Sequence, residues 1–320
     1  MSRTTNGHLN RNLSDSNGAQ NSDNRPLLRS FPRPSGYGTQ YLTGSDEGND
    51  ASTSEKVKDY LMADVAVRWA DLVLVVCFFV SGVIDAGAYN AYENFASMQT
   101  GNTVFAALGA SNLPKGAPRL AWTKSVCSIL SYILGSGLIA TFHRAFGDRK
   151  RWVFAVSFLF QGILVVISAV LVSRGSSSGS PGSNDPGALM AIPADPGFRW
   201  ADLIPIGLLS FQAAGKVVAS RMLDYNAMPC VVLTTLYTDL ASDPGLFTAG
   251  LTGNVNRNRR AGGAVFYFLG AVVGGAAAAH SIGFSGALWI AAGVHLGIVI
   301  CWMLWRAEEE GKGEEEAQEI

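Results

Sequence analysis

Six long apolar runs between residues 70 and 305 constrain the fold of this chain more than any other feature. A helix needs about 20 mostly apolar residues to cross a bilayer core that is roughly 30 Å thick. Each run is long enough for one crossing, and the runs cover residues 70–91, 122–142, 152–173, 201–222, 262–282 and 286–305. They predict an all-α, polytopic membrane helix bundle.

Polar ends flank this apolar region. Residues 1–63 are rich in Ser, Asn, Gly and Asp, and residues 307–320 are acidic. We expect a disordered N-terminal tail, a transmembrane domain over residues 64–306 and an acidic C-terminal tail. The net charge is −1 and no basic domain stands out, so nucleic-acid binding has no electrostatic basis here. The four cysteines are expected to be small buried side chains rather than disulfides.

Two shorter and more polar segments, 95–111 and 228–241, contain Gly, Thr, Asn or Asp where a lipid-facing helix would have Leu or Val. With these half-segments the order is span, half-segment, span, span, and the same order follows again. This pattern predicts an internal 3+3 duplication. The first repeat covers about 68–173, a linker rich in Gly, Ser and Pro covers 174–199, and the second repeat covers about 200–306.

The half-segments leave two topologies open. If both cross the membrane, there are eight spans and the repeats are parallel. If both enter and return, there are six spans and the repeats are inverted, as in many transporters. Basic residues cluster at 144–151 and at 257–260, and only six spans place both clusters on the cytoplasmic side. We therefore expect six spans with both termini in the cytoplasm.

A resemblance to a known family rests on residues in both halves. Residues 81–86 (SGVIDA) and 98–103 (MQTGNT) resemble the signature of the YoaK-like membrane proteins, which are catalogued as a domain of unknown function. Gln99 within the second motif, and residues 232–244 of the second half, are similar to the fungal branch. Residues 256–260 (NRNRR) resemble the basic loop of that branch. The resemblance implies a membrane fold and no established activity.

Ionisable residues inside the spans are the first candidates for a functional site, because a charge at that depth is costly. Asp85 lies on one face of the first span with Ser81 and Tyr89, and Lys216 lies on one face of the fourth span with Gln212 and Ser220. We expect Asp85 and Lys216 to pair and to line a central site, so that an apolar replacement of either would abolish transport. The alternatives are a pair that only fixes packing, or a Lys216 that reaches the membrane interface.

The half-segments supply a second set of candidates. Glycine tolerates the irregular backbone of such segments, and irregular backbone at membrane depth survives only where it lines a cavity or is buried in protein. The candidate solute contacts are Thr100, Gly101 and Asn102 in the first half and Thr234, Thr235, Thr238 and Asp239 in the second. The alternative is an ordinary re-entrant loop or a tight helix contact at Gly101. Gln161 in the third span is expected to donate a hydrogen bond to another helix, and His295, which is isolated in an apolar run, is expected to be a satisfied polar group rather than a proton relay.

No catalytic or metal-binding motif is present in the sequence, so we expect no enzyme, cofactor or metal. The sequence predicts a secondary transporter or channel-like protein for a small solute or ion, embedded in a lipid bilayer. The alternative is a membrane scaffold or sensor that acts through its polar tails. Residues 23–28 (DNRPLL) fit an acidic dileucine sorting pattern, which leaves the plasma membrane and the vacuolar or endosomal membrane as locations.

Overall fold

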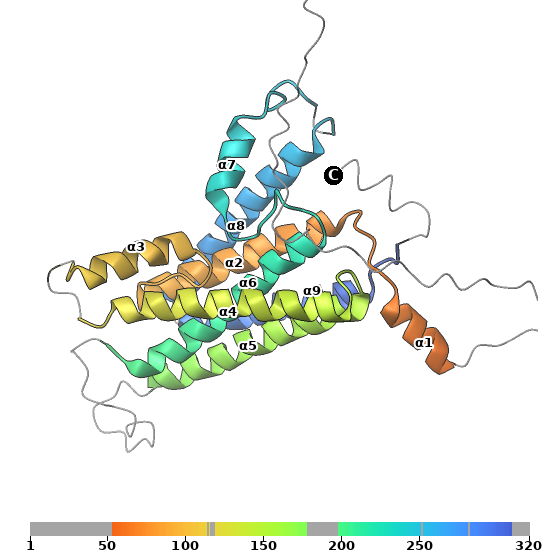
Figure 1. Cartoon of the computed structure of the whole chain (residues 1–320). Helices are drawn as coiled ribbons and strands as arrows, with labels where there is room; N and C mark the ends of the chain where they lie inside the picture. Colours follow the sequence, from red (N-terminus) through yellow and green to blue (C-terminus); the bar gives the residue numbers. More distant parts are fainter. Residues whose placement is uncertain are drawn as a thin grey trace, which may run out of the picture. The chain divides into compact units, whose positions relative to one another are not determined.

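The computed structural model describes residues 53–113, 115, 119–177, 198–250, 252–280 and 282–308. This part of the chain is all-helical and contains no strand (Figure 1). Six of its helices are long and apolar enough to cross a membrane, which confirms the predicted class of fold. The predictions for residues 1–52, for 178–197 of the linker and for residues 309–320 lie outside the described residues.

The six long helices match the six predicted spans, and two short helices match the half-segments. In chain order the helices are α1 (Thr53–Met62), α2 (Ala70–Tyr92), α3 (Gln99–Ala110), α4 (Trp122–Phe146), α5 (Arg151–Ser177), α6 (Leu203–Met222), α7 (Leu233–Ala241), α8 (Val255–Ala279) and α9 (Gly283–Met303). A 3-10 turn, Trp200–Asp202, leads into α6.

The start of one helix differs from the sequence prediction, and this difference changes the interpretation of the basic run at residues 256–260. Helix α8 begins at Val255, well before the predicted start at residue 262. Asn254 caps it, because its side-chain oxygen accepts a hydrogen bond from the backbone N–H of Arg257 at 2.8 Å. The run Asn256–Arg260 therefore forms the first turns of a helix, and the expectation of a basic loop was wrong.

Contacts between helix ends fix the direction of every long helix. The backbone N–H of Val65, before α2, donates to the carbonyl of Arg149, between α4 and α5, at 2.9 Å. The Arg149 side chain lies 2.5 Å from Asp224, just after α6. Arg259 in α8 pairs with Asp71 in α2 at 2.9 Å. The starts of α2, α5 and α8 and the ends of α4 and α6 thus lie at one end of the bundle, which we call the basic end.

Helix α9 also finishes at the basic end, where Ala66 donates to the carbonyl of Arg306 at 3.0 Å. At the far end, Lys124 of α4 lies 3.7 Å from Asp202, just before α6. Helices α2, α4 and α5 therefore run away from the basic end, back to it and away again. Helices α6, α8 and α9 run in the opposite directions.

The two short helices do not run the length of the bundle. Helix α3 connects the end of α2 to the start of α4, and both lie at the far end. Helix α7 connects the end of α6 to the start of α8, and both lie at the basic end. Each short segment therefore leaves and returns on one side (Figure 1). This is the six-span arrangement.

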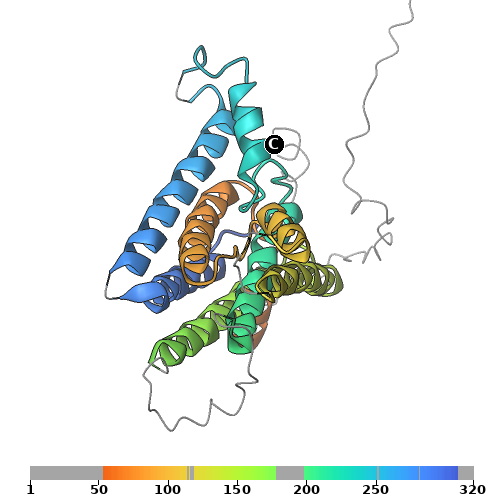
Figure 2. The same cartoon turned by 90° about the vertical axis from the view of Figure 1, so that its left-hand side faces the viewer.

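Three pairs of spans pack closely (Figure 2), and glycines bring the backbones of two of these pairs into contact. Helix α2 packs mainly on α8, α4 on α6 and α5 on α9. A Cβ atom added at Gly270 of α8 would lie 2.0 Å from the carbonyl oxygen of Phe79 in α2. One added at Gly135 of α4 would lie 2.4 Å from the carbonyl oxygen of Phe211 in α6. Small residues are the usual means by which membrane helices approach this closely.

Helix α1 lies within the segment for which the sequence predicted only disorder. Its Tyr60 hydroxyl donates to the carbonyl of Met303 at 2.7 Å. The buried Arg151 guanidinium lies 3.8 Å from the centre of the Tyr60 ring and donates to the carbonyl of Trp305 at 2.7 Å. These contacts attach α1 to the starts and ends of the spans at the basic end.

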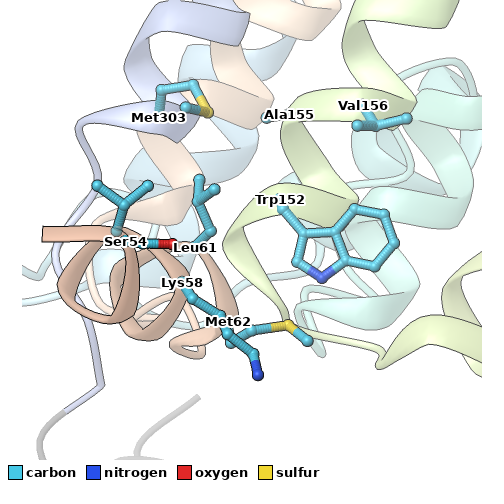
Figure 3. A pocket seen from close by; sticks show the side chains of 9 residues that line it. Ser54, Lys58, Leu61, Met62, Trp152, Ala155, Val156 and Met303 are labelled. Carbon is cyan, nitrogen blue, oxygen red and sulfur yellow. The ribbon is translucent and has the colours of Figure 1, made fainter. Parts of the chain in front are cut away.

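An apolar pocket of about 640 Å³ lies between α1 and the first turns of α5 (Figure 3). Its lining includes Leu61, Met62, Trp152, Val156 and Met303. It offers a polar solute few hydrogen-bonding groups, and no site residue predicted from the sequence lines it. The buried polar candidates, Asp85, Asn102, Gln212 and Lys216, lie elsewhere, inside the bundle.

Candidate functional site

Asp85 is buried in α2, about two turns before that helix ends, and four donors surround its carboxylate. The backbone N–H groups of Ala96 and Ser97 donate to Oδ1 at 2.9 and 2.8 Å. The Ser97 hydroxyl and the Tyr267 hydroxyl of α8 donate to Oδ2, the latter at 2.9 Å. The carboxylate therefore fixes the stretch before α3, and also α8, to α2.

Asn102 of α3 anchors the same stretch from the other side. Its Oδ1 accepts from the backbone N–H of Phe95 at 3.0 Å, and its Nδ2 donates to the carbonyl of Phe95 at 2.7 Å. Nδ2 also donates to Ser128 of α4, whose hydroxyl lies 2.8 Å from that of Ser210 in α6. We call this set the carboxylate network; it comprises Asp85, Ser97, Asn102, Ser128, Ser210 and Tyr267.

Lys216 is fully buried in α6 and has far fewer partners than Asp85. Its Nζ donates to Oε1 of Gln212, one turn earlier, at 3.2 Å. An ammonium carries three N–H donors, so the described part of the chain leaves two of them unused. The expected pairing of Asp85 with Lys216 is absent, since no ion pair within 4 Å joins them among the described residues, and the Asp85 oxygens accept from four other donors.

Two further buried polar side chains lie close to this part of α6: Gln161 against Gly215, the residue before Lys216, and His295 against Gly162, the residue after Gln161. Gln161 of α5 packs its amide against Gly215, where an added Cβ atom would lie 2.5 Å from the Gln161 Cδ. His295 of α9 packs against Gly162 of α5, where an added Cβ atom would lie 3.3 Å from the His295 Cβ. His295 interacts electrostatically with Lys216.

Three atoms in this region are buried without any hydrogen-bond partner: Gln161 Oε1, Gln212 Nε2 and His295 Nε2. Leaving a buried polar group unsatisfied costs about 1–3 kcal/mol. We call Gln161, Gln212, Lys216 and His295 the amine cluster. It has free donors and free acceptors, whereas the oxygens of Asp85 in the carboxylate network are already occupied.

The remaining candidates from the sequence lie away from both groups. Tyr89 is 48% exposed and stacks on Phe95 with ring centroids 5.1 Å apart. Thr100 is exposed, and Gly101 is partly buried beside the Phe95 ring. On α7 the exposed residues are Thr234, Thr235 and Thr238, while Asp239 lies 3.8 Å from Arg260. The structure thus brings together Asp85 with Asn102, and Gln212 with Lys216, and places the other candidates toward the surface.

Sequence reasoning did not assign Gln161 and His295 to the site. Gln161 was expected to donate to another helix, but among the described residues its amide donates within α5, to Ser157, and its Oε1 lacks a partner. His295 was expected to be satisfied, and its Nε2 lacks a partner. Their only sequence signal is a polar side chain isolated in an apolar run. That signal does not reveal which helix the residue will face.

Outside the spans, ionic contacts fix the loop between α7 and α8. Asp243 accepts hydrogen bonds from Asn254 Nδ2 and from the backbone N–H of Gly245, at 2.9 and 2.8 Å. Arg257 donates to the carbonyls of Ala249 and Gly250 at 2.7 and 2.9 Å. The hydrogen bond from Asn254, followed by that from Gly245, lowers the pKa of Asp243 below its ordinary value. The loop is therefore held by a carboxylate in its charged form.

Six apolar helices with a buried polar interior define an integral, multi-pass membrane protein. Residues 73–301 match the model of DUF1275, a family of proteins of unknown function, and the chain belongs to this family. The match confirms the resemblance to the YoaK-like proteins, while the fungal type stays a prediction. Comparisons with curated proteins and with solved structures find no match.

Proposed function

We propose that this protein is a secondary transporter or channel-like protein for a small solute. The observation that carries the proposal is the amine cluster, in which a fully buried Lys216 lies among polar atoms that lack partners. An ionisable residue within a membrane span is expensive, so its retention is by default a sign of function. Partners that the protein does not supply can come from a passing solute.

The pairing of the helices supports an internal duplication. In an internal duplication, α2, α3, α4 and α5 of the first half correspond in order to α6, α7, α8 and α9 of the second. The contact of α2 with α8 then corresponds to the contact of α6 with α4, and both are found. Likewise, the contact of α5 with α6 corresponds to that of α9 with α2. The contact of α5 with α9 joins two corresponding helices and so is its own counterpart. The helices of the two halves run in opposite directions, as shown above. Inverted repeats of this kind occur in many transporters, with the solute site at the repeat interface.

The charges support an orientation for the bundle. The cluster at residues 144–151 and the cluster at 257–260 both lie at the basic end. Short loops rich in Lys and Arg remain in the cytoplasm. The proposal therefore places the basic end, with the start of α2 and the end of α9, on the cytoplasmic side.

Flux through reconstituted protein tests this function. Purified protein in liposomes is exposed to a panel of small neutral and charged solutes, and entry is followed by stopped-flow light scattering and ion-sensitive dyes. We expect at least one solute to enter faster than into empty liposomes. Lys216→Met should lose that flux, and Lys150→Met, which removes a partly exposed lysine paired with Asp64, should keep it. If no solute of the panel crosses faster than in empty liposomes, the proposal is wrong.

A further inference from the structure

We infer that the amine cluster binds a small neutral solute that both accepts and donates hydrogen bonds, such as a polyol or an amide, and not an ion. This inference rests on the proposed transport function and names its class of substrate. It is carried by the hydrogen-bonding atoms that the cluster leaves unused and by the charge balance around them.

The donors of the cluster come from α6. Lys216 uses one of its N–H groups on Gln212 Oε1 and has two left. Gln212 Nε2 is buried and has no partner. A bound solute must therefore offer acceptor oxygens or nitrogens to this side of the cluster.

The acceptors come from α5 and α9. Gln161 Oε1 is buried without a donor. His295 Nδ1 lies 3.0 Å from the carbonyl oxygen of Ala291, and a carbonyl only accepts, so Nδ1 carries the ring hydrogen. In the neutral ring, Nε2 then holds a lone pair, and this atom has no partner either. A bound solute must therefore donate hydrogen bonds as well, which a simple anion or a metal cation cannot do.

The balance of charge around Lys216 also favours a neutral solute over an ion. Asp85 and Lys216 are fully or almost fully buried, carry opposite charges and interact electrostatically within one core. The other titratable groups facing Lys216 are Cys77, Cys230 and His295. An ion in this core would add a charge that no further side chain balances, and uncompensated charge in a dry interior is costly. A neutral solute adds none.

The pockets on the bundle surface offer no competing site for such a solute. The pocket at α1 is apolar, and a second pocket of about 400 Å³ is lined by α4, α5 and α6 with residues such as Phe160, Leu164 and Phe211. Neither contains a member of the amine cluster. Among the described residues, the buried side-chain atoms without a partner that lie in the middle of a span belong to the amine cluster, whereas the others lie near the helix ends, at Asp71, His143, Arg151, Trp152, Arg260 and Trp302.

The test compares neutral and ionic permeation in the same proteoliposomes. Glycerol, urea and formamide entry is measured by stopped-flow light scattering, and potassium and chloride entry by ion-sensitive dyes. We expect the full-length protein to pass at least one of the neutral probes and neither ion. Gln161→Leu and His295→Phe should lower the neutral flux about tenfold, the effect of losing roughly one hydrogen bond.

His280→Phe is the matched control. Among the described residues, the His280 ring bonds to one group, the carbonyl of Ala276 in the last turn of α8, at 2.7 Å, so this variant should keep full flux. The comparison of solute classes uses the unmodified protein, so it stands even if a variant fails to fold. Ion flux that depends on Lys216, without neutral flux, would overturn this inference and leave the transport function intact. Absence of both fluxes would overturn the inference together with the proposed function.

Discussion

Asp85 and Lys216, which are both buried within their spans, differ in their surroundings, and we assign them different roles on this basis. Asp85 accepts from two backbone N–H groups and two hydroxyls, so its charge is well solvated by the protein. Lys216 has a single hydrogen bond. We conclude that Asp85 holds the stretch before α3 in place, and we propose Lys216 as the residue that meets the solute.

This assignment predicts different effects on stability. In Asp85→Asn an amide NH₂ replaces one carboxylate oxygen and cannot accept the hydrogen bonds that this oxygen accepted. We therefore expect the free energy of unfolding to fall by about 1–3 kcal/mol. Lys216→Met removes a buried charge that makes one hydrogen bond among the described residues, so we expect the saved cost of burying that charge to offset the lost attraction to Asp85 and to leave the free energy of unfolding within about 1 kcal/mol. Denaturant unfolding of the purified protein in detergent measures both. If Asp85→Asn kept the free energy of unfolding of the unmodified protein while Lys216→Met lost about 1–3 kcal/mol, the assignment would be reversed.

Substitutions at two glycines of α8 test how closely α8 and α2 approach each other. Gly270→Ala would place a methyl group 2.0 Å from a backbone oxygen of α2, so the helices must separate. We expect a loss of about 1–3 kcal/mol, the usual cost of overpacking. Gly275→Ala is the control in the same helix, since nothing lies within 4 Å of an added Cβ atom there. Melting temperatures in detergent should fall for the first variant only; an equal fall in both would argue against backbone contact.

At the scale of elements, the short helices show what local pattern does and does not predict. The polar composition of 95–111 and 228–241 correctly marked two segments that do not run the length of the bundle. It did not locate their helical parts, because the preceding stretches are fixed by distant groups. Asp85 and Asn102 hold the stretch before α3, and Cys230, with its left-handed backbone (φ 60°), packs against Leu74 of α2.

The loop between α7 and α8 predicts a dependence on pH. A carboxyl whose pKa falls on folding stabilises the folded form above its unfolded pKa, and this contribution is lost as the pH falls through the folded value. Asp243 is such a group, with an ordinary pKa of 3.8 and a lower one in this loop. The loop should therefore be firmly held at neutral pH and loosen only in acid below that ordinary value.

A spin label on Phe247→Cys, at a side chain that is 93% exposed in this loop, can report this change in a background without the four native cysteines. Its mobility should rise on acidification below the ordinary pKa of Asp243, while a label on Ser111→Cys at the far end stays unchanged. With Asp243→Asn the loop label should be mobile already at neutral pH. An equal rise at both positions would indicate general unfolding instead.

Hydropathy and length were sufficient to predict the six spans, because crossing a bilayer imposes the same requirement on each helix separately. Helix α1 could not be found this way, since it is short and depends on contacts of Tyr60 with Met303 and Arg151. Only half of the amine cluster could be predicted from the sequence, because Gln212 and Lys216 share one helix face. Gln161 joins them through the packing of α5 on α6, and His295 through the packing of α9 on α5. Spacing along one helix carries no information on such pairing.

At the scale of the whole molecule, each half is incomplete without the other. The first span of each half packs mainly on the second long span of the other half, α2 on α8 and α6 on α4. The amine cluster likewise draws residues from α5 of the first half and from α6 and α9 of the second. Neither half alone would therefore bury its polar residues, and we expect separately expressed halves to be stable only when they are produced together.

The most direct test of this account is the sidedness of two engineered cysteines, in a background without the native ones. Ser111→Cys lies just after α3, Ser242→Cys lies just after α7, and both positions are exposed. Inverted halves place these positions on opposite sides. A membrane-impermeant thiol reagent applied to intact cells should therefore label Ser111→Cys at once, and Ser242→Cys only after the membrane is opened. If both positions were labelled in intact cells, or both only after opening, that result would contradict the inverted arrangement on which the proposed solute site depends.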